Sequence, residues 1–151
     1  MYIIVATLLA LMFAGSIYFG MATKSDEDQG GAVEELVIFA KSYLKDSTNA
    51  ETGRLLDCSG YTRKVFGNFD IKLSSSSVEQ YEGAMRLDSS RFKAGDLVFF
   101  VTRGNQISHV GIGIDSLYFI HSPGRGKFVR IDSLTHNYWK PRIAGYGRMW
   151  Y

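Results

Sequence analysis

The sequence predicts an α+β domain in which helices come first and pack on one face of an antiparallel sheet. Before residue 67, apolar residues recur at helical spacing. From Gly95 onward the chain consists of short segments rich in β-branched and aromatic residues, and turn residues separate these segments. Helices followed by strands are typical of the α+β class. The 151 residues contain no internal repeat and suffice for a single domain.

Two helices are expected ahead of the strands. The stretch GAVEELVIFAKSYL predicts an amphipathic helix over about residues 32–44, and its apolar stripe consists of Val33, Leu36, Val37, Ala40, Tyr43 and Leu44. A second helix is expected from Cys58 to Phe66, with Asp57 or Cys58 at its N-cap and Gly67 just past its end. Between the two helices, KDSTNAETGR has the composition of a loop, and further on SSVEQYEG has that of a short helical turn.

Five strands are expected after Gly95, in the segments DLVFFV, SHVGIGI, LYFIHS, KFVRI and AGYGRMWY. The segment NYWKPR, between the last two, is expected to pack Trp139 under the end of the sheet. No structure is predicted for Gly83–Asp88 from its sequence.

The first twenty-two residues differ from the rest of the chain. The segment from Tyr2 to Met21 carries no charge, and as a helix it would span about 30 Å, the thickness of a membrane core. No Lys or Arg precedes it, which favours an uncleaved anchor, whereas Gly20-Met21-Ala22 resembles a signal-peptide cleavage site. We therefore expect a signal peptide or membrane anchor over residues 1–22, a polar tether over 23–31 and the folded domain over 32–151.

The net charge of +2 is too small to indicate binding to nucleic acid. Residues 1–35 hold one of the 17 basic and five of the 15 acidic side chains, which leaves 16 bases against 10 acids in residues 36–151. A mildly basic domain suits an anionic partner, and a solvated surface accounts for it equally well.

The one cysteine, Cys58, falls in the first turn of the second predicted helix. Unpaired backbone N–H groups and the positive end of the helix dipole favour thiolate over thiol at such a position. Nucleophilic catalysis by cysteine also needs an imidazole, together with a third group that orients it. A buried structural cysteine is the alternative.

Two histidines lie on predicted neighbouring strands, twelve residues apart. If a three-residue connection centred on Asp115 joins the strands, His109 pairs opposite His121 and both point to one face of the sheet. Gly111 and Gly113 share that face and are expected to leave room for a helix or a substrate. The third histidine, His136, lies in a polar segment and is expected at the surface.

A cysteine and two histidines also suggest a zinc site. Zinc sites in proteins usually have at least three protein ligands, often including a short-spaced pair such as H-x-x-x-H or C-x-x-C, and neither spacing occurs here. The residues therefore favour a Cys–His–His catalytic site, and we expect neither a metal nor a cofactor.

Five motifs follow one another in order: DCSGY, FKAGDLVFF, ISHVGIGI, FIHS and VRIDSL…NYWKPRIAGYGR. Together they resemble the NlpC-type cell-wall cysteine peptidases, a compact papain-like family, over about residues 33–148. The resemblance implies helices packed on a five- to six-stranded antiparallel sheet. It also implies a peptidoglycan hydrolase of the bacterial cell envelope, a cysteine endopeptidase that cleaves stem peptides between D-γ-glutamate and the diamino acid.

Matched residue by residue, the resemblance implies Cys58 as nucleophile, His109 as general base and His121 as the group that orients the imidazole. The backbone N–H of Cys58 would help bind the oxyanion. Asp57 and Ser59 flank the nucleophile, and they either contact substrate or only cap the helix. The family's aromatic-x-x-Gly-Gly stretch before the cysteine is missing, although Tyr43 lies in that region.

Two other functions remain open at this stage. One is an amidase or acyltransferase that uses the same three residues on a lipid or protein substrate. The other is an inactive binding module, against which the presence of all three residues argues. The expected partners are the peptidoglycan stem peptide and, through residues 2–21, the membrane.

Overall fold

The computed structural model describes residues 30–149. The leader predicted for residues 1–22 and most of the tether predicted for 23–31 therefore lie outside the described residues. The chain divides between Val33 and Glu34, and the description below concerns the unit that follows this division. Within residues 30–149, no helix is both long enough and apolar enough to cross a membrane.

The first helix covers the start of this unit and runs to residue 41. Its predicted apolar stripe is buried at Leu36, Val37 and Ala40. The helix ends about three residues earlier than predicted, because Leu44 forms a bridge with Val129, which needs extended backbone. A short helix, α2 (Ala50–Arg54), occupies the second half of the segment 45–54 that was predicted as a loop, so the prediction was wrong for that half.

Two further helices follow, both close to their predicted positions. Helix α3 (Cys58–Gly67) begins after the N-cap residue Asp57, and Gly67 is its last residue instead of lying past its end. Helix α4 (Ser77–Gly83) confirms the helical turn expected in SSVEQYEG.

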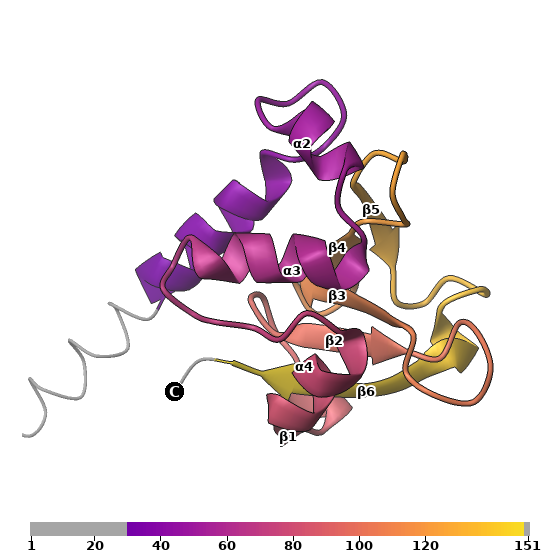
Figure 1. Cartoon of the computed structure of the whole chain (residues 1–151). Helices are drawn as coiled ribbons and strands as arrows, with labels where there is room; N and C mark the ends of the chain where they lie inside the picture. Colours follow the sequence, from indigo (N-terminus) through magenta and orange to yellow (C-terminus); the bar gives the residue numbers. More distant parts are fainter. Residues whose placement is uncertain (1–29, 150–151) are drawn as a thin grey trace, which may run out of the picture. The chain divides into compact units, whose positions relative to one another are not determined.

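The strands form one six-stranded antiparallel sheet in the order β1-β6-β2-β3-β4-β5 (Figure 1). They are β1 (Met85–Leu87), β2 (Leu97–Phe100), β3 (His109–Gly113), β4 (Tyr118–His121), β5 (Arg130–Ser133) and β6 (Ile143–Arg148). The predicted fold class is confirmed. Strand β1 lies in the region for which the sequence predicted nothing, and β5 starts three residues later than expected.

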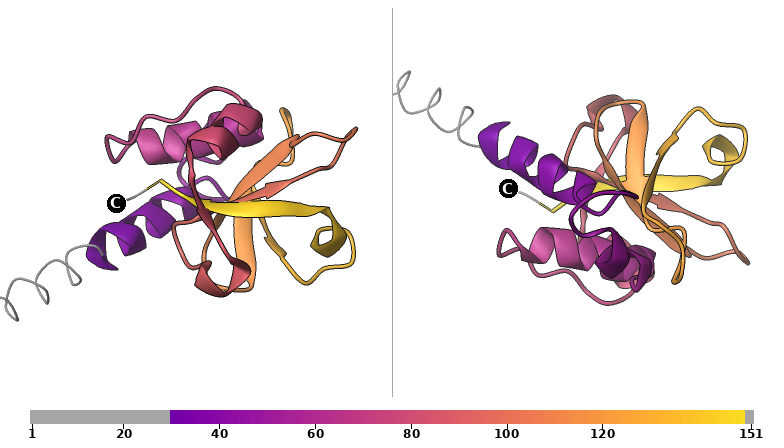
Figure 2. Two further views of the ribbon diagram at one scale, coloured as in Figure 1. Left: turned by 90° about the horizontal axis from the view of Figure 1, so that it is seen from below. Right: turned by 90° about the horizontal axis from the view of Figure 1, so that it is seen from above.

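Side chains alternate between the two faces of the sheet and form two separate cores. Helix α3 lies against one face of the sheet (Figure 2). Residues such as Phe99, Val110 and Ile120 pack on the helices at that face. The other face carries a second cluster, which consists of Phe92, Val98, Phe100, Phe119, Leu134 and Trp139. Trp139 is 5% exposed, and its predicted packing on the sheet is confirmed.

Candidate active site

Cys58 is the first residue of α3, and the sequence places it there through a helix cap. The Asp57 carboxylate accepts a hydrogen bond from the Gly60 N–H at 2.8 Å, which fixes the start of the helix one residue before the thiol. The thiol is partly buried. The backbone N–H groups of Val110, Ser59 and Cys58 itself act on its sulfur. The sulfur therefore lies against the start of β3, at the residue that follows His109 in the sequence.

The acidity of this thiol differs from the sequence-based expectation. Burial raises the pKa of Cys58, and the nearby Asp57 carboxylate raises it further, whereas the three backbone N–H groups lower it. Burial of the sulfur raises the pKa more than the N–H groups at the helix start lower it, because a buried thiolate loses more hydration than these donors replace. The resting group is therefore the neutral thiol.

His109 and His121 lie on the same face of the sheet, as predicted, but in a different register. Ile112 pairs with Ile120 and Gly113 with Phe119, so the connection is centred on Ser116 and not on Asp115. The register is shifted by two residues, which places His109 diagonally from His121 and not opposite it. The shared face survives because side chains alternate with a period of two.

The diagonal placement brings the two imidazoles into direct contact. His109 Nε2 and His121 Nδ1 are 2.8 Å apart, and the ring planes are nearly perpendicular. Both rings are buried, at 7% and 0% exposure. The indole of Trp139 stacks on the His109 ring with centroids 5.2 Å apart. Packing therefore holds the imidazole pair in one orientation.

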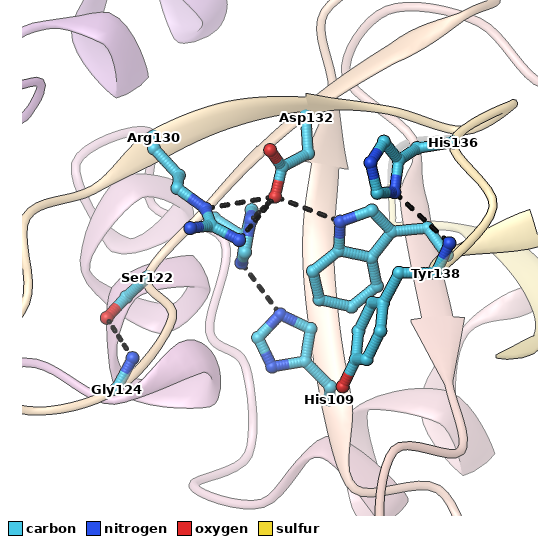
Figure 3. Close-up of polar contacts among 9 residues, drawn as sticks. His109, Ser122, Gly124, Arg130, Asp132, His136 and Tyr138 are labelled. Atoms are coloured by element: carbon cyan, nitrogen blue, oxygen red, sulfur yellow. Dashed lines mark hydrogen bonds and ion pairs between the residues drawn. The ribbon is translucent and has the colours of Figure 1, made fainter.

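Asp132, on β5, continues the chain of contacts and was not predicted. Its Oδ2 atom lies 2.9 Å from His121 Nε2, and it accepts hydrogen bonds from Trp139 Nε1 at 2.9 Å and Arg130 Nε at 3.0 Å (Figure 3). Burial raises the pKa of Asp132, but the hydrogen bonds with His121 and Trp139, together with the charges of His121 and Arg130, outweigh this, and the pKa falls to about 2. The sequence offered only VRIDSL as a strand, with no signal that this carboxylate reaches His121.

Both imidazoles are neutral at ordinary pH. Burial, the neighbouring His121 and the positive charges of Arg130 and Arg103 together lower the pKa of His109 to about 3, while Asp132 opposes the shift. Burial also lowers the pKa of His121, against the hydrogen bond to Asp132. The site thus combines an unprotonated imidazole with a protonated thiol.

The glycines of β3 have a different function from the one expected. A Cβ atom at Gly111 would lie 2.5 Å from the Phe119 ring, and one at Gly113 would lie 2.6 Å from the Phe92 ring. Aromatic rings of the second cluster therefore fill the space above both glycines, and the expectation of room for a helix or substrate was wrong.

Asp57 and Ser59 both have partners within the protein. The Oδ2 atom of Asp57 lies 3.6 Å from Arg125 Nη2 in an exposed ion pair. The Ser59 hydroxyl donates to the Ser75 carbonyl oxygen at 2.8 Å. His136 is exposed, as predicted. Tyr43 is 2% exposed and packs edge-on against Tyr61, so it belongs to the core.

Two further features of the surroundings bear on the site. A hollow of about 390 Å³ runs along the outer side of α3, and it is lined by Leu56, Gly60, Arg63, Lys64, Gly67 and Asn68. It contains neither the thiol nor the imidazoles, so we assign it no part in the chemistry. Within residues 30–149, no group of three or more His, Cys, Asp or Glu side chains is arranged to hold a metal ion.

A cysteine at a helix start, a buried imidazole pair on the sheet and helices packed against that antiparallel sheet define a papain-like domain. The chain belongs to the NlpC/P60 family, whose model matches residues 44–148. It is 40% identical over 93 residues to the Listeria monocytogenes protein named "Probable endopeptidase p60". The aligned residues are 62% of this chain and 19% of that protein. The chain thus spans about a fifth of the length of this relative.

Two other relatives and a solved structure also match this chain. Murein DD-endopeptidase MepH of Escherichia coli is 33% identical over 72% of this chain and 41% of its own length. The muramidase/DL-endopeptidase CwlT of Bacillus subtilis is 30% identical over 77% of this chain and 35% of its own. A Bacillus cereus NlpC/P60 protein superimposes with a TM-score of 0.58 at 28% identity, over 62% of this chain and 32% of that one.

The buried histidines predict that acid destabilises the fold. The pKa values of both histidines are lower in the folded chain than in the unfolded one. For His109, the unfolded chain therefore binds a proton that the native chain does not between about pH 6.5 and pH 3, and His121 adds to this loss below about pH 6.5. Each such proton makes stability fall by about 1.4 kcal/mol per pH unit as the pH is lowered.

Urea unfolding midpoints at about pH 7 and about pH 4.5 measure this loss. The wild type should lose stability over the interval, His109→Gln should lose less, and the surface variant His136→Asn should behave as the wild type. An equal loss in the His109 variant and the wild type would contradict the assignment of the low pKa to His109.

Proposed function

We propose that this domain is a cysteine endopeptidase that hydrolyses an amide bond in the stem peptides of peptidoglycan. One observation carries the proposal: in a chain of the NlpC/P60 family, the Cys58 sulfur interacts with the backbone N–H of Val110, the residue that follows His109, and His109 is bonded to His121. The names of the relatives, which include a murein endopeptidase and a muramidase/endopeptidase, support peptidoglycan as the substrate.

The proposed chemistry begins with a proton transfer between two neutral groups. His109 Nε2 is engaged with His121, so Nδ1 is the ring nitrogen left to take the proton of the Cys58 thiol. The sulfur then adds to the scissile carbonyl carbon, and the resulting imidazolium gives its proton to the leaving amine nitrogen as the C–N bond breaks. A water molecule, deprotonated by the same nitrogen, attacks the thioester and releases the acid and the thiol.

The backbone N–H of Cys58 is proposed to bind the oxyanion formed in each addition. N–H groups in the first turn of a helix have no partner within the helix, and the start of α3 carries the positive end of the helix dipole. Removing a donor of this kind typically costs about 3 to 4 kcal/mol in transition-state stabilisation. No side chain needs to move to supply it.

Asp57 and Ser59 remain proposed contacts to the substrate. The Asp57 side chain is 48% exposed, so its Oδ2 atom can leave Arg125 for a substrate N–H at little cost. The Ser59 hydroxyl is bonded to Ser75, so a contact from this residue would involve its backbone N–H.

Product analysis tests the proposal. The full chain is incubated with purified peptidoglycan and with defined muropeptides, and the new termini are identified by mass spectrometry. We expect cleavage between D-γ-glutamate and the diamino acid. One relative is named a DD-endopeptidase and another a DL-endopeptidase, so relatives differ in the bond that their names specify. The bond cut by this chain must therefore be identified from its products. Intact muropeptides together with turnover of lipid or protein acyl groups would overturn the proposal in favour of an amidase or acyltransferase.

The proposed location is the bacterial cell envelope, where the substrate is found. The uncharged segment over residues 2–21 supports attachment to the membrane, either before cleavage as a signal peptide or permanently as an anchor. Sedimentation of the full chain with the membrane fraction distinguishes an anchor from a released protein.

A further inference from the structure

Three side-chain nitrogen atoms converge on a single oxygen of Asp132. Arg130 Nε, Trp139 Nε1 and His121 Nε2 all lie within 3.0 Å of Oδ2, and Arg130 NH2 adds an ion pair at 2.9 Å. Guanidinium and indole N–H groups donate hydrogen bonds and never accept them. Asp132 Oδ2, which contacts both groups, can therefore act only as a hydrogen-bond acceptor.

This restriction passes along the chain of contacts to His109. Because Oδ2 only accepts, the hydrogen of His121 must be on Nε2, and in a neutral imidazole Nδ1 is then an acceptor. The contact of 2.8 Å to Nδ1 therefore needs a donor, so His109 carries its hydrogen on Nε2. The remaining nitrogen, Nδ1 of His109, is left with a free lone pair.

We propose that Asp132 is a positioning residue that fixes the tautomers of both His121 and His109, and so keeps His109 Nδ1 unprotonated and ready to accept a proton. The consequence for the reaction rate rests on the proposed function, because it takes Nδ1 as the base for Cys58. The tautomers themselves exist whether or not the chain hydrolyses anything, so the two parts can be tested separately.

Trp139 holds the carboxylate and the base together. Its indole donates to Asp132 and stacks on the His109 ring, and its plane meets the His121 ring edge-on. The side chain is nearly buried among Phe100 and Phe119, so it has little freedom to turn. A movement of Asp132 away from His121 would also break the indole hydrogen bond.

The charge of Asp132 has a second effect on His109. Arg130 and Arg103 disfavour a positive charge on this imidazole, and Asp132 is the carboxylate that opposes them. During the proposed reaction His109 becomes an imidazolium, and a nearby fixed negative charge lowers the cost of that step. Asparagine at this position would retain an acceptor and lose the charge, which allows the two effects to be separated.

The first experiment measures the tautomers in the wild-type full chain. Nitrogen-15 NMR of histidine-labelled protein distinguishes protonated from unprotonated ring nitrogens, and His136→Asn identifies the signals of the surface histidine. We expect His109 and His121 each to carry hydrogen on Nε2 alone at neutral pH. A hydrogen on Nδ1 of either residue, or a mixture of tautomers, would overturn the proposal, even if the chain proved inactive on peptidoglycan.

The second experiment compares Asp132→Leu with Asp132→Asn. The leucine variant has no acceptor, so we expect mixed tautomers and a kcat lower by about 100-fold, with KM within about threefold. In the asparagine variant, Arg130 and Trp139 should turn the amide oxygen toward themselves. We therefore expect wild-type tautomers and a loss of only about tenfold, due to the missing charge.

A matched control separates positioning from stability. Asp96 is also a carboxylate held by an arginine, with Oδ1 2.7 Å from Arg148 Nε, and it is buried away from both histidines. Asp96→Asn should lower the unfolding midpoint and leave the tautomers and kcat unchanged. If Asp132→Leu instead loses activity only in proportion to its folded fraction, with wild-type tautomers, Asp132 is merely structural. If the leucine variant does not fold, the wild-type spectrum and the asparagine variant still decide.

Discussion

Replacing Cys58 by alanine is expected to reduce the release of peptides from peptidoglycan by at least about 10⁴-fold, to the background rate. The proposed reaction forms a thioester on this sulfur, and no other cysteine is present in the sequence to replace it. The neighbouring imidazole pair and the oxyanion donor would remain, but without a nucleophile they act only on water. The assay follows new amino groups and soluble muropeptides over time.

A folded protein is the necessary control for this variant. Cys58 is only partly buried, so the loss of one sulfur should leave the unfolding midpoint close to that of the wild type. Cys58→Ser provides a second comparison, because a hydroxyl of similar size is a far weaker acid than a thiol and should also be inactive. Activity within about tenfold of the wild type in the alanine variant would exclude the acyl-enzyme mechanism.

Alkylation of the thiol gives less information than the sequence suggests. From the helix start alone, a reaction pKa near the ordinary value of about 8.5 would indicate an inactive module. In the structure, burial raises the pKa of Cys58, while His109 stays unprotonated down to about pH 3. A high alkylation pKa is therefore expected of an enzyme that moves the proton only during attack, so turnover is the informative measurement.

The positions of Cys58, His109 and His121 could be predicted because each depends on a local rule. A carboxylate before C-S-G marks a helix start, and alternation within strands decides the face of the sheet. The face of the sheet on which a side chain lies depends only on whether its position in the strand is odd or even. The predicted face was therefore correct despite a two-residue error in register. The contact between the rings needed the true register, because only the diagonal arrangement gives Nε2 and Nδ1 their 2.8 Å separation.

Asp132 and the low pKa of His109 could not be predicted, because both depend on long-range packing. Asp132 reaches His121 through the pairing of β4 with β5, and the sequence placed β5 three residues too early. The Phe92 ring, which fills the space above Gly113, also comes from a segment outside the β3–β4 hairpin. Strand existence is a local property, whereas the filling of one face is a property of the whole sheet.

His109→Gln is expected to lower kcat by about 10³- to 10⁴-fold, which is the upper part of the contribution of a general base. Glutamine is close to histidine in volume, and its amide can keep a hydrogen bond to His121, but neither of its polar atoms can accept and return a proton. The thiol would then stay protonated, because burial holds the pKa of Cys58 above its ordinary value. KM should change little, since substrate contacts are not assigned to this imidazole.

Two comparisons make this prediction specific to the role of His109. His121→Gln removes only the orienting partner and should cost about 10²-fold, while the exposed His136→Asn should retain wild-type kcat. In the double variant Cys58→Ala with His109→Gln, the rate should equal that of Cys58→Ala alone, because residues that act as one unit are not additive. A His121 variant slower than the His109 variant would reverse the order of the two imidazoles, since the residue in direct contact with the reacting proton must carry the larger loss.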